Sequence, residues 1–294
     1  MGSTTPLYAK WARQMKLEVL TDEVDEGAKL HWIGPRRFDR VFLYAHGGGF
    51  SLPVKPHEHL NFLLQVQKDL EANAGGVGVI ALEYSLTPDS PFPTQLRQAN
   101  AAISHLVSKG VDTQNIVLGG DSAGGNLVLQ IAAHILHPLP DIPAPPTSGP
   151  FGGAFLMSPW VTFDDSSPSF AENDKLDTTS AQALNFLAMH AQTGITPETR
   201  NYVEAITADE SWWTGLDKVF LRILNTAGQV ECLRDAIAIF GETLNKHVKD
   251  TTNVVEKNAV HEDVLRDFSA GQGVTSENYK LDIEWLSDTF KGQR

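Results

Sequence analysis

Six short apolar runs recur along this chain of 294 residues, and they are rich in the β-branched and aromatic residues that favour strands. Longer stretches between them place apolar residues at helical spacing, namely 60–73, 93–109, 124–137 and 233–248. Strands that alternate with helices predict a mostly parallel sheet with helices on both faces. The runs lack a clean apolar–polar alternation, which is typical of strands buried on both sides. They lie at 40–45, 77–83, 115–119, 153–157, 219–224 and 253–260.

Two further segments break this rhythm and predict a cap. Residues 1–35 mix polar and apolar positions and predict one or two short N-terminal helices. Residues 161–214, between the fourth and fifth runs, are rich in Asp, Ser, Thr and Asn, with a helix expected at 179–192. We expect this insertion to cover the carboxyl-terminal edge of the sheet. The core then consists of residues 36–160 and 215–294.

The charge of the chain excludes several classes of partner. It has 23 Lys and Arg against 36 Asp and Glu, a formal charge of −13, which repels nucleic-acid phosphates and anionic lipid headgroups. A neutral or cationic small molecule is the more natural partner, and no nucleic-acid binding is expected. No apolar run approaches the ~20 residues that a membrane-spanning helix needs, so no stable membrane insertion is expected.

The single cysteine, Cys232, rules out an internal disulfide and fits a reducing compartment. Residues 1–10 lack the apolar core of a signal peptide, so we expect a soluble, cytoplasmic protein. His57 and His59 have no carboxylate or cysteine partner at metal-ligand spacing, and zinc is not expected. The oligomeric state stays open, with a homodimer as one candidate assembly.

The segment 120–124 (GDSAG) is the strongest local signal for chemistry. This G-x-S-x-G pattern follows a predicted strand and opens a predicted helix, as a nucleophile elbow does. The flanking glycines let strand and helix approach closely, so the hydroxyl of Ser122 stands clear above the sheet. The helix N-terminus beneath it favours developing negative charge. The alternative is a Gly/Ser turn with no chemical role.

The segment 46–50 (HGGGF) follows another predicted strand and leaves main-chain amides free to converge on an oxyanion. We expect Gly48 and Gly49 to supply two N–H donors and Ala123 a third. A flexible turn or a phosphate-binding loop is the alternative, but no lysine follows at P-loop spacing. His46 itself is expected to be a structural hydrogen bonder rather than a base.

A serine nucleophile needs a base to accept its proton and a carboxylate to hold that base. In enzymes whose nucleophile lies on such a strand-to-helix turn, the nucleophile comes first along the chain, then the acid, and then the base. Glu231 lies in the loop beyond the fifth predicted strand, and Asp235, one turn into the next helix, is the alternative acid. His261 directly follows the sixth predicted strand, whereas His247 lies in a helical pattern typical of a solvated surface. The sequence therefore favours Ser122, Glu231 and His261.

Taken together, these motifs resemble the hormone-sensitive-lipase family of α/β hydrolases. The segments 46–49 (HGGG) and 120–127 (GDSAGGNL) carry the resemblance, and 82–98 (LEYSLTPDSPFPTQLRQ) looks closest to fungal members similar to steryl acetyl hydrolase. The resemblance covers most of the chain, from about residue 40 to residue 261. Further matches are 158–160 (SPW), 231–235 (ECLRD) and His261.

The resemblance implies an α/β-hydrolase fold, a cap formed by the N-terminal helices and the 161–214 insertion, and a carboxylester hydrolase that uses no cofactor. It supports the assignment of the three catalytic groups and the three oxyanion donors. Three positions depart from the family pattern. Pro53 stands where glycine is common, and Ser85 replaces a common arginine. Glu262 follows His261 and puts beside the base an acid that can raise its pKa.

Phe50, Trp212 and Trp213 are expected to contact substrate, although helix-to-core packing explains the two tryptophans equally well. Asp121 is expected to hydrogen-bond local backbone, and Cys232 to fill space in the core.

Two other functions fit the same motifs. An acyltransferase would use the same triad but exclude water from the acyl-enzyme. A binding protein of the same fold that has lost catalysis is the second alternative, and the presence of His261 argues against it. The natural ester, its acyl length and its stereochemistry stay open, because specificity resides in the arrangement of the cap.

Overall fold

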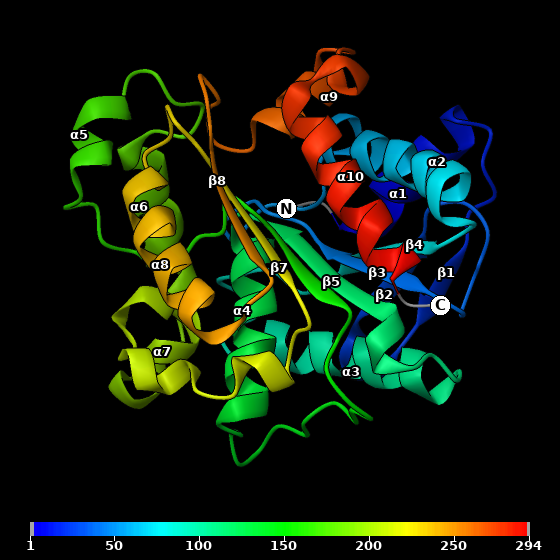
Figure 1. The fold of residues 1–294 in the computed structure, drawn as a ribbon, viewed down its shortest axis with the longest axis horizontal. Helices are drawn as coiled ribbons and strands as arrows, with labels where there is room; N and C mark the ends of the chain where they lie inside the picture. The colour runs from blue at the N-terminus through cyan, green and yellow to red at the C-terminus, as the bar shows by residue number, and fades with distance from the viewer. Residues whose placement is uncertain (1–2, 293–294) are drawn as a thin grey trace.

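An eight-stranded sheet forms the centre of the protein in a computed structural model that describes residues 3–292 (Figure 1). The strand order is β1-β2-β4-β3-β5-β6-β7-β8. β1 and β2 are antiparallel to their neighbours, whereas β3 to β8 are parallel to one another, as expected for an α/β fold. The strands are β1 (Thr21–Glu23), β2 (Lys29–Trp32), β3 (Val41–Ala45), β4 (Gly78–Glu83), β5 (Ile116–Asp121), β6 (Gly153–Met157), β7 (Ile223–Gly228) and β8 (Thr251–Glu256).

Each face of the sheet has its own layer of helices. Along β3, Val41, Leu43 and Ala45 pack in one apolar cluster with α3, α4 and α8, and Phe42 and Tyr44 pack in a second cluster with α1, α2, α9 and α10 (Figure 1). Successive side chains of a strand point to opposite faces, so an uninterrupted apolar strand supplies both clusters. These helices are α1 (Thr4–Gln14), α2 (Asn61–Ala74), α3 (Thr94–Ser108), α4 (Ala123–Leu136), α8 (Arg234–His247), α9 (Asp263–Ser269) and α10 (Glu277–Lys291).

The prediction that residues 1–35 form only cap helices was wrong. The described residues of this segment, 3–35, form the helix α1, then β1 at the edge of the sheet, and then β2, which pairs with both β1 and β4. The reason is a period of two: Leu30 and Trp32 pack in the cluster of one face, while His31 contacts the ring of Tyr8 on the other. Pairing of β2 with β4 therefore makes these residues part of the core.

The fifth predicted strand was displaced by four residues, since the prediction began at 219 and β7 begins at Ile223. Val219 and Phe220 fill the core after a short 3₁₀ helix, and Phe220 forms an isolated parallel bridge with Phe151 ahead of the strand. The strand instead continues through polar Asn225, whose Nδ2 donates to Oδ1 of Asn253 on β8 at 3.0 Å.

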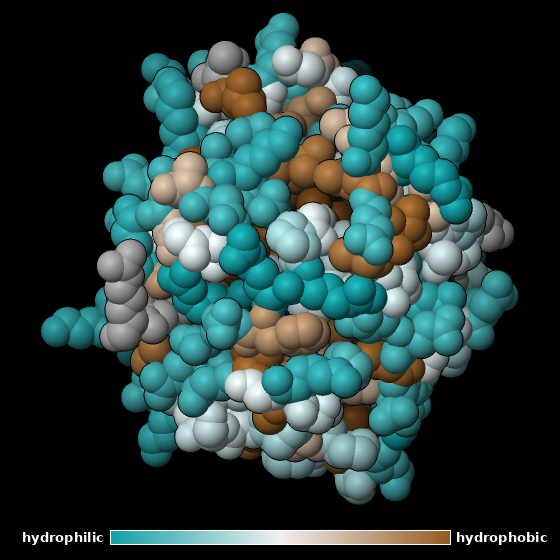
Figure 2. Space-filling model, turned by 90° about the vertical axis from the view of Figure 1, so that its right-hand side faces the viewer, coloured by the Kyte–Doolittle hydropathy of each residue, from teal (hydrophilic) through white to brown (hydrophobic). Residues whose placement is uncertain are grey.

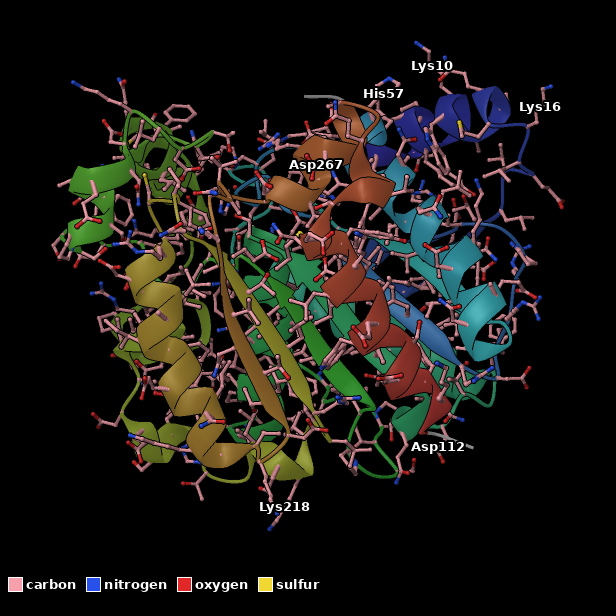
Figure 3. All side chains as sticks on the ribbon, turned by 45° about the horizontal axis from the view of Figure 1, so that its top comes forward. Lys10, Lys16, His57, Asp112, Lys218 and Asp267 are labelled. Carbon is pink, nitrogen blue, oxygen red and sulfur yellow. The ribbon has the colours of Figure 1, made fainter. Side chains whose placement is uncertain are left out.

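The 161–214 insertion contains α5 (Pro168–Asn173), α6 (Ala181–Ala191), α7 (Arg200–Val203) and several short 3₁₀ helices. The helix predicted at 179–192 corresponds to α6. Figure 3 distinguishes the two edges of the sheet. Asp112 and Lys218, which precede β5 and β7, lie at the lower end, whereas His57 and Asp267, which follow β3 and β8, lie at the upper end.

The surface on the side of α1 and α2 is mainly hydrophilic, with small hydrophobic patches between the polar side chains (Figure 2). Within residues 3–292, no helix combines the length and apolarity needed to cross a membrane.

Candidate active site

Ser122 occupies the turn between β5 and α4. Its φ of 47° and ψ of −114° lie outside the favoured regions for an L-residue, as expected of a strained elbow. Gly124 makes the turn feasible, because a Cβ at this position would lie 1.9 Å from the carbonyl oxygen of Ala45 on β3. The close approach of helix and strand lifts Ser122 to the carboxyl edge of the sheet, where it lines a cavity of about 360 Å³.

The two residues expected to complete the triad follow neighbouring strands. Glu231 lies three residues after β7, and His261 lies five residues after β8. Nδ1 of His261 is 3.7 Å from Oε2 of Glu231, an ion-pair distance longer than a hydrogen bond. The same oxygen accepts hydrogen bonds from Oγ of Ser158 at 2.6 Å and from N of Gly228 at 2.9 Å. His261 lines the same cavity as Ser122.

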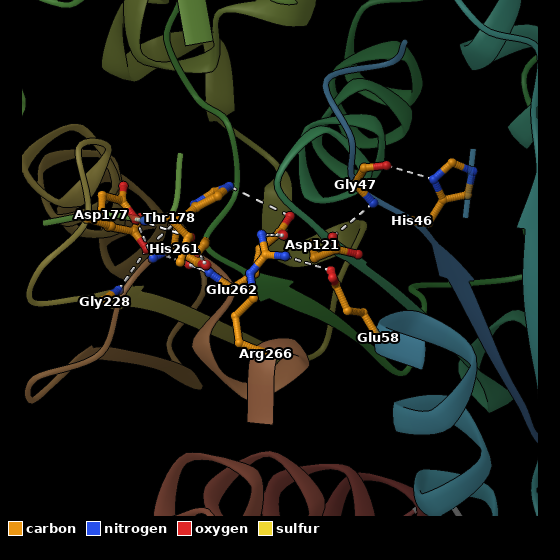
Figure 4. A network of polar contacts seen from close by, with 12 residues as sticks. His46, Gly47, Glu58, Asp121, Asp177, Thr178, Gly228, His261, Glu262 and Arg266 are labelled. Carbon is orange, nitrogen blue, oxygen red and sulfur yellow. Dashed lines mark hydrogen bonds and ion pairs between the residues drawn. The ribbon is translucent and has the colours of Figure 1, made fainter. Parts of the chain in front are cut away.

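The insertion holds the backbone of both residues through Asp177. Its Oδ1 accepts from N of His261 at 2.9 Å, and its Oδ2 accepts from N of Cys232, next to Glu231, at 2.8 Å (Figure 4). Oγ1 of Thr178 donates to O of His261 at 3.2 Å. Sequence reasoning missed Asp177, because it stands in a polar segment with no motif.

The glycine loop borders the cavity as expected. Gly48 and Gly49 line it together with Ser122, and Ala123 is the first residue of α4, so its amide is not used by a helical hydrogen bond. Gly49 has a φ of 61°, and a Cβ there would lie 2.7–2.9 Å from side-chain atoms of Leu187 on α6. The insertion thus packs directly on the loop that carries the expected oxyanion donors.

The cavity is lined by apolar and by polar side chains, called here its apolar wall and its polar wall. Its remaining lining residues are Leu52, Trp160, Ala183, Leu184 and Leu187 on the apolar side, and Lys55, Thr178, Thr179, Glu262 and Arg266 on the polar side.

Phe50, Trp212 and Trp213, which were expected to contact substrate, do not line this cavity. Phe50 is buried in the core against Tyr84. Trp213 packs edge-on against Phe240 of α8, and Trp212 stacks on the ring of His137. Large aromatic side chains bury much apolar area, and here they join the insertion to the core.

Asp121, next to the nucleophile, binds far more than local backbone. Its carboxylate accepts hydrogen bonds from the hydroxyl of Tyr44 at 2.7 Å, from N of Gly47 at 2.9 Å and from Nε2 of His59 at 3.1 Å. All of these groups are buried. Burial alone would raise the pKa of Asp121, but the charge and hydrogen bonds of His59 hold it well below its usual value. Asp121 therefore anchors the glycine loop to β5.

Glu262, the acid next to His261 that departs from the family pattern, also lies in the site. It is buried in a left-handed conformation with a φ of 56°. Its Oε1 lies 3.7 Å from Nε2 of His261, and its Oε2 lies 3.4 Å from Nη2 of Arg266. Arg266 also donates from Nη1 to Glu58 at 2.8 Å (Figure 4). Burial and the charge of Asp121 raise the pKa of Glu262 to about 7.

The alternatives considered for acid and base have other partners. Asp235 pairs with Arg234 at 2.9 Å and accepts from N of Ser169, as expected of a structural residue. His247 lies on α8, and its Nε2 contacts O of Glu210 at 2.9 Å; it does not line the cavity. Burial lowers the pKa of His46 to about 4, and its Nδ1 contacts O of Gly47. None of these residues lines the cavity with Ser122.

A family model described as the alpha/beta hydrolase fold matches residues 42–265. The chain belongs to this α/β-hydrolase family. It is 36% identical over 132 residues to an acetyl-hydrolase of Streptomyces hygroscopicus, covering 44% of this chain and 39% of that protein. It is also 33% identical over 108 residues to human (Homo sapiens) hormone-sensitive lipase, covering 34% of this chain and 10% of that protein. The resemblance to hormone-sensitive lipases is thereby confirmed.

These matches span well under half the length of the two relatives. Among solved structures, this α/β hydrolase superimposes on an esterase/lipase from an uncultured bacterium with a TM-score of 0.74 at 21% identity, over 93% of this chain and 85% of that one. At this level of identity the structural match establishes the fold.

Proposed function

We propose that this α/β hydrolase is a serine carboxylester hydrolase that cleaves small to medium acyl esters through an acyl-enzyme. The proposal depends on one observation, which is that the expected nucleophile, base and oxyanion loop meet at one cavity. Ser122, His261 and the glycines of the 46–50 loop come from three distant parts of the chain and line one cavity. An activated hydroxyl facing free main-chain amides is the arrangement that acyl transfer requires.

In the proposed reaction, Ser122 attacks the ester carbonyl while Nε2 of His261 accepts its proton. The amides of Gly48, Gly49 and Ala123 stabilise the oxyanion, and Glu231 stabilises the imidazolium. The tetrahedral intermediate expels the alcohol, which takes the proton from His261. Water then attacks the acyl-enzyme, gives its proton to the same nitrogen, and releases the acid and free Ser122.

The insertion 161–214 is proposed to act as the cap that shapes the substrate site. Leu184 and Leu187 of α6 contribute to the apolar wall, and Thr178 and Thr179 to the polar wall. An apolar wall next to the nucleophile suits an acyl or alcohol chain of modest length in a cavity of about 360 Å³. The contacts of Asp177 with N of His261 and N of Cys232 support a role of the cap in positioning the triad as well.

The proposal extends to an intracellular location, supported by the single cysteine, which is buried and unpaired. Fractionation of the source cells with an antibody to this chain would test it, and recovery only from the medium would contradict it.

Replacement of Ser122 with alanine tests the proposed activity. Because this hydroxyl is the only nucleophile proposed, S122A should lower kcat for p-nitrophenyl butyrate by a factor of at least about 10⁴. A fluorophosphonate probe should label the wild-type protein and not S122A, and circular dichroism should show that both are folded. Full activity or full labelling in folded S122A would refute the assignment.

A further inference from the structure

A second carboxylate lies against the imidazole of His261, at the ring nitrogen opposite the one that faces Glu231. Oε1 of Glu262 is 3.7 Å from Nε2, the same distance as Oε2 of Glu231 from Nδ1. Nε2 is the nitrogen that must accept the Ser122 proton when Nδ1 faces the acid. Within residues 3–292, the Ser122 hydroxyl forms no hydrogen bond with another group of the chain. The neighbour of Nε2 in this structure is therefore Glu262.

Glu262 is held in place by two charged partners. Its carboxyl group interacts with that of Asp121, and its Oε2 lies 3.4 Å from Nη2 of Arg266. Two carboxyl groups in contact share a proton, because two buried negative charges repel each other. Asp121 already accepts three hydrogen bonds from buried donors, which stabilise its ionised form. The shared proton therefore resides mainly on Glu262 at low pH and leaves from it as the pH rises.

We infer that Glu262 is a positioning residue for proton transfer: its carboxylate holds the imidazolium form of His261 and sets the pH range in which this base can accept the Ser122 proton. The inference rests on the proposed function, since it requires Ser122 as nucleophile and His261 as base. A residue outside the triad thus controls the pH range in which the triad is active.

The direction of the pKa shifts agrees with this geometry. Burial alone would lower the pKa of His261, but the charge of Glu262, followed by the nearby carboxylate of Glu231, raises it to about 9. Asp177 on the insertion adds to this effect from the backbone side. Among the described residues, Glu231 and Glu262 are the two whose carboxylates pair with the ring nitrogens.

Three further groups, on other elements, act on Glu262. Arg266 of α9 favours its ionised form and is itself shared with Glu58 on the neighbouring helical turn, Pro56–Leu60. Asp121 on β5 opposes ionisation, and His59, which pairs with Asp121, favours it. Removal of the Glu262 charge is therefore the most direct way to change the environment of Nε2.

The consequence is a pH profile displaced toward alkaline values. His261 must be neutral to act as a base, and an ionised Glu262 keeps it protonated to higher pH, so kcat/KM should reach its plateau only at alkaline pH. Glu262→Gln keeps the side-chain shape and can still donate an N–H to Asp121, but it carries no charge. Its acid limb should lie at lower pH than that of the wild type.

The experiment is the pH dependence of kcat/KM for p-nitrophenyl acetate, corrected for uncatalysed hydrolysis, in wild type and E262Q. We expect the acid limb of E262Q to shift down by about one pH unit, which alone would raise kcat/KM at pH 7 roughly tenfold. Its alkaline plateau should fall about twofold, because a less basic imidazole is a weaker base and its cation loses a partner, so the net rise at pH 7 should be about fivefold. The two profiles should cross. Damage to the fold would lower kcat/KM at every pH and could not make them cross.

Asp263→Asn is the matched control, because it removes the same charge one residue along the chain from a carboxylate that accepts from N of Val260. Its limb should stay within about 0.3 pH units of the wild type. If E262Q does not fold, E262N serves in its place, since asparagine tolerates the left-handed conformation better than most residues. An uncharged variant whose limb coincides with that of the wild type, or an equal shift in D263N, would overturn the inference.

NMR titration of the His261 imidazole, assigned with a His261→Asn sample, gives a readout without substrate. The titration midpoint should move down in E262Q by the same amount as the kinetic limb. Failure of the inference is distinguishable from failure of the proposed function. If S122A abolishes turnover but E262Q leaves both midpoint and limb unchanged, only the role of Glu262 is wrong.

Discussion

Three non-glycine residues of the candidate site have left-handed backbone angles. Non-glycine residues rarely adopt positive φ, yet Ser122, Ser158 and Glu262 have φ values of 47°, 46° and 56°. Each such conformation costs roughly 1–3 kcal/mol and persists only where the surroundings over-determine it. Ser158 uses its geometry to donate to Glu231, and Glu262 to reach Nε2 of His261. At these three positions the strained backbone therefore orients a side chain in a direction that a regular helix or strand would not give it.

At the scale of single residues, substitution of Glu231 tests its role as the acid. Glu231→Gln should lower kcat for p-nitrophenyl butyrate by a factor on the order of 10³–10⁴ with little change in KM, because the amide cannot stabilise the imidazolium. Asp235→Asn, four residues further on, should retain near wild-type kcat, since Asp235 pairs with Arg234. A larger loss in D235N than in E231Q would transfer the role of the acid to Asp235.

At the scale of elements, α6 connects the insertion to the oxyanion loop. Leu187 lies so close to Gly49 that a Cβ on the glycine would have no room, while Leu184, one turn earlier, lines the same cavity. The opposite face of α6 exposes Met189, with 64% of its surface accessible. Leu184 and Leu187 thus present an apolar surface to the cavity, and we expect the position of α6 to limit the length of chain that fits beside Ser122.

Shortening of Leu187 tests this limit. Leu187→Ala should raise kcat/KM for p-nitrophenyl hexanoate relative to acetate roughly tenfold, since each methylene accommodated in an apolar pocket contributes about 1–3 kcal/mol. Met189→Ala is the matched control on the same helix and should leave the ratio unchanged. An unchanged ratio in L187A would show that another wall determines chain length.

At the scale of the whole molecule, the charge of −13 creates a field that extends beyond the cavity. The two cations on the polar wall, Lys55 and Arg266, are both paired with Glu58 and do little to offset it. Long-range attraction should therefore concentrate cationic substrates near the protein at low salt, and screening should remove the effect.

A pair of isosteric substrates isolates this field. The ratio of kcat/KM for acetylthiocholine to that for its neutral analogue 3,3-dimethylbutyl thioacetate should fall as ionic strength rises from about 10 mM to about 500 mM, because the Debye length shrinks from about 30 Å to a few Å. The neutral substrate alone should be nearly insensitive to salt. A ratio independent of salt would show that local charges at the cavity mouth cancel the global field.

The sequence by itself determined the parallel core of the sheet and the residues proposed to carry the chemistry. Apolar runs buried on both faces specify the parallel strands, and the glycines of 120–124 specify the elbow, because these patterns reflect local geometry. The order of Ser122, Glu231 and His261 at strand ends followed from the same logic, since carboxyl ends of parallel strands meet at one edge. The family was recognisable for the same reason.

Only the tertiary structure decided which side chains share a space. The contacts of Asp177 with two backbone amides, of Asp121 with His59, and of Glu262 with the imidazole join residues far apart in the chain, and no local pattern encodes them. The same limit explains why the sequence left two roles open for Trp212 and Trp213 and did not predict the strands β1 and β2, because an aromatic or polar residue has the same identity in the core and in a cavity. Its neighbours, which the fold alone supplies, decide between the two.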